Sequence, residues 1–119
     1  MARSLTFGGV EIHPDGSVRY GGEWQNASSC TAYVETAGQL RERSTLTRVG
    51  AGAVIAGPVG AVLGALFRKK VDEREVYLMV EGDKSAWLVK VHPSRSMEAR
   101  RFAVALNNAS REWAAKEGR

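Results

Sequence analysis

The stretch VYLMVE, residues 76–81, decides the fold of this chain. In an extended strand, successive side chains point to opposite faces of the sheet, so three aliphatic side chains share one face while Tyr77 and Met79 share the other. Both faces are apolar, whereas a strand with one face in water alternates apolar with polar residues. The pattern therefore predicts a strand over residues 75–81 that is at least partly covered on both faces.

A β-hairpin is expected near the N-terminus, over about residues 5–24. Alternating residues surround His13-Pro14-Asp15-Gly16, a turn sequence in which proline fixes φ and glycine permits the exit. Gly21-Gly22 is expected to end or bend the second strand of this hairpin, and in the second case residues 23–25 continue it past a bulge. In this interpretation His13 is a turn residue and Trp24 belongs to the core or its rim.

Three further segments have strand composition or alternation. Residues 30–36 are rich in β-branched and aromatic types, and residues 41–49 alternate charged, hydroxyl and apolar side chains. Residues 86–92 form the last strand and are expected to pair with the strand at 75–81 through the short turn at 82–84.

Beyond Ser96 the hydrophobic period changes from 2 to 3.6. Phe102, Leu106, Ala109 and Trp113 fall on one stripe, opposite a charged and polar side. A single-stripe helix needs a packing partner for stability in water. The sequence predicts a C-terminal amphipathic helix over about residues 96–116 that packs one face onto the sheet.

The elements together predict one α+β domain over residues 1–119, a length that supports a single hydrophobic core. We expect an antiparallel β-barrel, or a strongly bent sheet, whose open end is plugged by the helix.

Four parts of the sequence carry a family-level pattern, and in chain order they are Thr45–Arg48, Gly57-Pro58, Arg68–Gly82 and Glu98–Ala109. In this order they resemble a group of small proteins from actinobacteria and their bacteriophages that are similar to bacterial pleckstrin-homology-like (PH-like) domains. The resemblance spans Phe7 to Ala109 and implies a PH-like fold. It brings no substrate, cofactor or catalytic residue with it, and the long glycine-rich connection departs from the usual short form.

That connection is the apolar stretch GAGAVIAGPVGAVLGALF, residues 50–67, which lacks charged and hydrogen-bonding side chains. Its length is at the lower end of a membrane-spanning helix, and the Gly60 to Gly64 spacing permits close helix approach. Glycine, alanine and Pro58 make it only weakly hydrophobic. A single span would also place the strands on either side of it on opposite sides of a bilayer. We therefore expect an apolar excursion from one continuous sheet.

Such an excursion needs cover from its own domain, another copy of the chain, or a membrane surface. Self-association is the leading interpretation because small residues allow close backbone contact. Peripheral contact with an anionic membrane is the second, and burial in the core stays open. The residues predicted for self-association or membrane contact are Val54, Ile55, Pro58, Val59, Gly60, Leu63, Gly64, Leu66 and Phe67, and those predicted for an anionic surface are Arg48, Arg68, Lys69 and Lys70.

Composition argues against several other classes. The net charge is +4, but the basic residues are spread out apart from Arg68–Lys70 and Arg100-Arg101, and a basic face with aromatic residues among the charges, as nucleic acid requires, is only weakly present. One cysteine, Cys30, cannot form an internal disulfide, which favours the reducing cytoplasm, and we expect it to be a small buried hydrophobe. No phosphate-binding loop, nucleophile arrangement or metal-ligand spacing is evident, so no catalytic, cofactor-binding or metal-binding residue is predicted.

The sequence thus predicts a non-catalytic interaction or scaffold module in the cytoplasm, including the inner face of the membrane. We expect it to form homo-oligomers and to bind protein or an anionic membrane surface through residues 50–67. The alternative is a phage or bacterial regulatory protein that inserts the same residues into a membrane.

Overall fold

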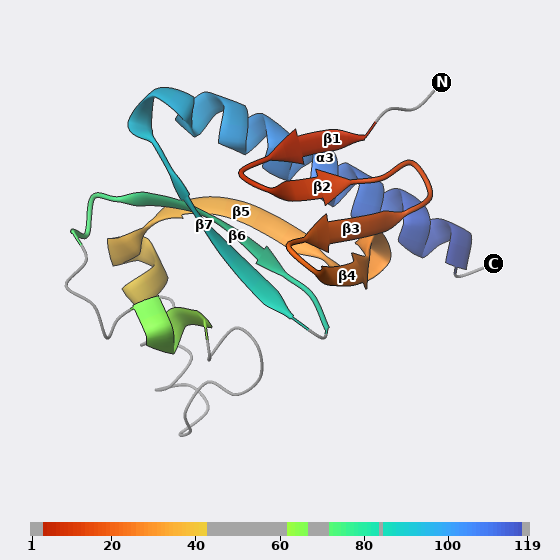
Figure 1. Ribbon diagram of the computed structural model, residues 1–119, viewed down its shortest axis with the longest axis horizontal. Helices are drawn as coiled ribbons and strands as arrows, with labels where there is room; N and C mark the ends of the chain where they lie inside the picture. Colours follow the sequence, from red (N-terminus) through yellow and green to blue (C-terminus); the bar gives the residue numbers. More distant parts are fainter. Residues whose placement is uncertain (1–3, 43–61, 67–71, 84, 118–119) are drawn as a thin grey trace.

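The computed structural model describes residues 4–42, 62–66, 72–83 and 85–117 (Figure 1). Within these residues, strands form one four-stranded and one three-stranded antiparallel sheet, followed by a long C-terminal helix. The α+β prediction is confirmed. The described strands form two sheets instead of one closed barrel or one bent sheet, because a 3-10 helix, η1 (Ala27–Ser29), separates the last strand of the first sheet from the first strand of the second.

The first sheet is a simple meander in the order β1-β2-β3-β4. Its strands are β1 (Leu5–Phe7), β2 (Val10–Ile12), β3 (Ser17–Tyr20) and β4 (Glu23–Asn26).

The predicted hairpin is confirmed as β2 and β3. At its turn, the Gly16 amide donates to the His13 carbonyl at 3.1 Å, and Gly16 has a φ of +89°. Gly21-Gly22 ends the second strand of the hairpin, one of the two predicted outcomes, and Gly21 has a φ of +60°. The predicted continuation past a bulge is wrong, because the chain reverses there and residues 23–26 pair with β3 as a strand of their own.

The second sheet has the order β5-β6-β7, and its strands confirm the predictions for residues 30–36, 75–81 and 86–92. Its strands are β5 (Thr31–Thr36), β6 (Val76–Glu81) and β7 (Ala86–Val91). Thr36 at the end of β5 pairs with Val76 at the start of β6, so the chain between them leaves the sheet and returns at the same place.

The strand predicted over 41–49 is wrong where it can be examined, because residues 37–42 are helical and residues 43–49 lie outside the described part of the chain. The physical reason is a capping box. The Gln39 amide donates to Thr36 Oγ1 at 3.1 Å, and the Gln39 side chain accepts from the Thr36 amide at 2.8 Å. These two bonds start a helix directly after β5.

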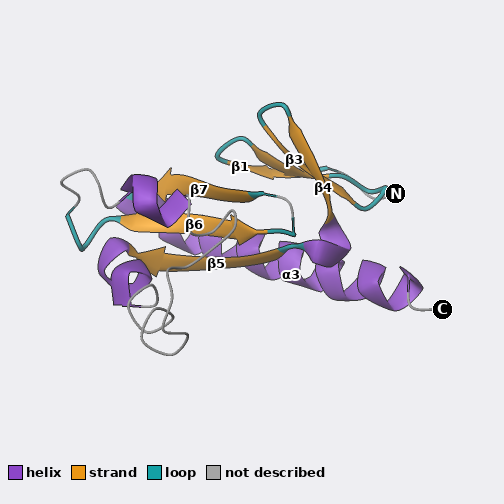
Figure 2. Cartoon of the chain, turned by 90° about the horizontal axis from the view of Figure 1, so that it is seen from below, coloured by secondary structure: helices purple, strands orange, loops and turns teal. Residues whose placement is uncertain are grey.

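The C-terminal helix α3 (Ser96–Glu117) confirms the prediction for residues 96–116 and runs along the three-stranded sheet (Figure 2). Phe102 and Leu106 are buried, while Ala109 and Trp113 pack against the same core. Trp113 lies over the hairpin turn so closely that a Cβ on Gly16 would be 2.6 Å from its ring. The helix therefore holds both sheets together.

β6 is buried on both faces, as its alternation predicts. Leu78 and Val80 belong to a first core, which is shared with the four-stranded sheet and α3. Tyr77 and Met79 belong to a second core. The other buried members of the second core are Ala37, Leu40, Leu63, Leu66 and Ala86.

Candidate functional site

The described end of the apolar stretch lies against the chain's own sheet. Leu63 is 2% exposed and Leu66 is 9% exposed, both in the second core, and residues 62–66 are helical. Gly64 is exposed, with open space where a Cβ would stand. Core burial, one of the three interpretations that the sequence left open, accounts for these two leucines.

The other residues predicted for contact lie outside the described part of the chain. They are Val54, Ile55, Pro58, Val59, Gly60 and Phe67, together with the basic residues Arg48, Arg68, Lys69 and Lys70.

A polar connection joins the first sheet to the β6–β7 turn. The buried Gln25 side chain pairs with the backbone of Ser85, donating to its carbonyl and accepting from its amide, each at 3.1 Å. Gly82 is required beside it, because a Cβ there would be 1.9 Å from Gln25 Oε1. The Glu23 carboxylate accepts two further hydrogen bonds, from Ser85 Oγ at 2.7 Å and from Trp87 Nε1 at 3.1 Å. This connection holds β4 in a defined position against the turn.

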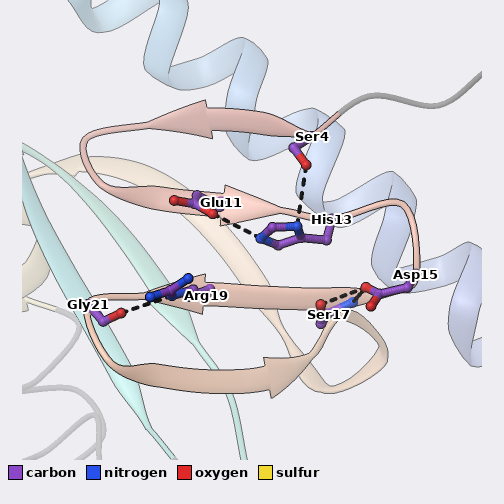
Figure 3. Close-up of polar contacts among 7 residues, drawn as sticks. All are labelled: Ser4, Glu11, His13, Asp15, Ser17, Arg19 and Gly21. Carbon is purple, nitrogen blue, oxygen red and sulfur yellow. Dashed lines mark hydrogen bonds and ion pairs between the residues drawn. The ribbon is translucent and has the colours of Figure 1, made fainter.

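The outer face of the first sheet carries an aromatic residue supported by polar neighbours. Trp24 is 52% exposed, with the Arg19 guanidinium 5.1 Å from its ring centroid and the His13 ring 5.4 Å away. His13 contacts Glu11 Oε1 at 2.9 Å and Ser4 Oγ at 3.3 Å (Figure 3). The predicted turn residue His13 thus also helps to fix an exposed tryptophan that the sequence assigned to the core or rim.

A small cavity of about 120 Å³ opens beside Trp24, where β3 and β4 meet the β6–β7 turn. It is lined by Ser17, Trp24, Gln25, Asn26 and Asp83. Asn26 stands at the N-cap position of η1 but makes no side-chain capping hydrogen bond. The cavity therefore combines an indole, a carboxylate, two amides and a hydroxyl.

A second cavity, of about 360 Å³, lies where β6 begins and β7 ends, and it carries both signs of charge. Glu75 accepts from Tyr77 Oη at 2.7 Å and contacts Lys90 Nζ at 3.3 Å. The bond from Tyr77 is the main cause that lowers the pKa of Glu75, with Lys90 acting in the same direction. Its other lining residues are Asp72, Arg74, Val76, Val91, His92 and Pro93. The mixed charges favour no single sign of ligand.

Cys30 is buried, 1% exposed, in the first core, as predicted. Burial raises its pKa to about 11, so the thiol stays protonated at neutral pH, a form that is a poor nucleophile. Among the described residues, no group of three or more His, Cys, Asp and Glu side chains could hold a metal ion. No helix in the described ranges has the length and apolar character needed to cross a bilayer.

Comparison with known proteins returned no match, whether against family models, curated proteins or solved structures. The site beside Trp24 was also absent from the sequence predictions. Its lining residues come from positions 17–26 and from position 83, and only the pairing of β4 with the turn brings them together. The sequence offers one signal for this site: Asn26 is a residue type that often caps helices, so its side chain is a candidate for a polar role.

Proposed function

We propose that this chain is a non-catalytic cytoplasmic interaction module that self-associates and binds protein or an anionic membrane surface through its apolar excursion. The observation that carries the proposal is the pairing of β5 with β6 on either side of the excursion, residue by residue from Thr31 with Glu81 to Thr36 with Val76.

This pairing favours an excursion over a single membrane span. The strands before and after residues 50–67 belong to one sheet, and a single pass through a bilayer would separate them. Leu63 and Leu66 anchor the end of the stretch on that sheet. The proposed contact surface therefore consists of the more N-terminal apolar residues, above all Val54, Ile55 and Val59. The basic residues Arg68 to Lys70 are proposed to contact an anionic surface.

A PH-like arrangement is part of the proposal. Two antiparallel sheets that follow each other along the chain, with a C-terminal helix packed across both, support it. The resemblance over Phe7 to Ala109 supports it independently of the geometry.

The test changes the excursion while sparing the core. A triple variant, Val54→Asp, Ile55→Asp and Val59→Asp, leaves Leu63 and Leu66 in place. The matched control is Val104→Asp, since Val104 is 59% exposed on α3. We expect the wild type and the control to form the same oligomer by light scattering, and the triple variant to be a monomer because buried charges oppose association.

Flotation with vesicles of phosphatidylcholine and phosphatidylglycerol tests the membrane part of the proposal on the same three proteins. If the triple variant matches the wild type in both mass and flotation, the proposal fails. Alkaline carbonate extraction distinguishes this proposal from the alternative, a regulatory protein that inserts residues 50–67 into a membrane. A chain inserted in the bilayer stays with the membrane pellet, whereas a peripheral one is released.

A further inference from the structure

We propose that the cavity beside Trp24 binds a cationic side chain, preferably arginine, presented by a protein partner. The proposal concerns residues other than 50–67 and does not depend on how that stretch is used.

Size restricts the occupant. The cavity has a volume of about 120 Å³. Pockets for whole small molecules or cofactors are several times larger, about 300–1,000 Å³. A cavity of this size therefore fits the end of one side chain, and the rest of the ligand has to lie outside on the open sheet face.

The lining groups select a cation. Asp83 supplies a carboxylate to the lining. The Ser17 hydroxyl donates its proton to Asp15 Oδ1 at 2.6 Å, so toward a ligand its oxygen can act only as a hydrogen-bond acceptor. Asn26 adds an amide that is not used to cap η1. An aromatic face next to a carboxylate suits a guanidinium, which stacks through its plane and forms paired hydrogen bonds through its edge.

The Arg19 guanidinium, 5.1 Å from the Trp24 ring centroid, shows that this indole can contact a guanidinium, and a partner's group would use the part of Trp24 that lines the cavity, where Arg19 is not a lining residue. The surrounding residues are held in place before any partner arrives. Gln25 is paired with the Ser85 backbone, and Ser17 is held by Asp15, to which its amide also donates at 3.0 Å. A site fixed in advance loses little entropy on binding.

The experiment uses the full chain labelled with ¹⁵N and two blocked peptides, acetyl-Gly-Arg-Gly-amide and its citrulline counterpart. Citrulline keeps the shape of arginine and removes the charge. We expect the arginine peptide to shift the Trp24 indole and Asn26 amide resonances in a saturable way, and the citrulline peptide to bind at least about threefold more weakly.

Variants assign the effect to the cavity. Asp83→Asn and Trp24→Ala are expected to weaken binding about two- to fivefold, read from the Asn26 amide, and Trp24→Phe less than Trp24→Ala. Matched controls are Glu112→Gln, an exposed acid on α3, and Leu5→Ala, an apolar residue that is 49% exposed. Both controls are expected to bind as the wild type does.

Three results would overturn the proposal: equal shifts with the citrulline peptide, unchanged binding by Asp83→Asn, or no shift of the Trp24 and Asn26 resonances at any peptide concentration. Asp83 is exposed, so its variant tests the site even if Trp24→Ala disturbs the fold.

Discussion

The two faces of β6 carry similar apolar residues but are covered in different ways. Leu78 and Val80 face a core closed by α3, an uninterrupted helix of 22 residues, and by the four-stranded sheet. Tyr77 and Met79 face a core closed by residues 37–42 and 62–66, two short helical segments of the connection between β5 and β6. In the described residues, the first core contains more than twice as many buried residues as the second.

This difference gives the two cores different roles: the first stabilises the fold, and the second holds the segment proposed for partner contact. A large core around a continuous helix supplies most of the hydrophobic free energy of folding, in proportion to the apolar area that it buries. A smaller core made by short segments can open locally without unfolding the rest. The excursion proposed for partner contact is attached to the second, smaller core.

The largest expected effect compares one leucine from each core. Leu78→Ala should lower the free energy of unfolding by about 2–5 kcal/mol, because Leu78 is fully buried in the first core. Leu63→Ala should lower it less, while speeding hydrogen exchange and proteolysis in residues 37–66. Urea denaturation and hydrogen exchange measure the two effects. Equal losses of global stability in both variants would show that the two cores unfold as one unit.

An intermediate effect tests how α3 is attached to the edge of the second sheet. Asn107 donates to the Ala32 carbonyl and accepts from the Ala32 amide, each at 2.8 Å. Asn107→Ala should lower the free energy of unfolding by about 1–3 kcal/mol, because two partly buried backbone groups lose their partner. Asn108→Ala, at the exposed neighbouring position, is the control and should change it by less than about 0.5 kcal/mol. Similar losses in both variants would contradict this role of Asn107.

The last expected effect is confined to alkaline pH and differs between the cores. Burial raises the pKa of Cys30 from 9.0 to about 11 in the first core. In the second core, burial and then Glu75 raise the pKa of Tyr77 from 10.0 to about 12. A raised pKa in the folded state stabilises it fully below the unfolded value, and this contribution is lost as pH rises toward the folded value.

Stability should therefore fall between pH 9 and 11 through Cys30 and between pH 10 and 12 through Tyr77. Cys30→Ala should remove the first loss and Tyr77→Phe the second, as measured by urea midpoints across this range. A wild-type profile that matches both variants would contradict the assignment.

Local patterns predicted most of the elements. The alternation of residues 75–81, the turn at His13 to Gly16 and the 3.6-residue period of α3 were each confirmed, because such patterns report which faces of a single element are apolar. The strand predicted over 41–49 is wrong at residues 41 and 42, because the capping box between Thr36 and Gln39 starts a helix directly after β5. At Gly21-Gly22 the sequence leaves both the end of a strand and a bend open, because a pair of glycines permits several backbone paths, and in the structure the strand ends there.

The candidate sites were less predictable. The apolar stretch is evident from composition. The burial of Leu63 and Leu66 depends on a tertiary contact, because they share a core with Tyr77 and Met79 of β6. The cavity beside Trp24 requires the contact between Gln25 and Ser85, which are 60 positions apart. A contact at that distance leaves no periodic signal in one sequence.

The sequence by itself determined the strand character of β6, the amphipathic helix α3, the hairpin turn and the apolar composition of residues 50–67, because these follow from neighbouring residues and backbone preferences. Only the tertiary structure decided that the strands form two sheets, that Leu78 and Tyr77 face different cores, and that Trp24 lies beside a cavity with Asp83. The physical reason is that side-chain patterns specify which face needs cover, whereas long-range packing decides which residues provide it.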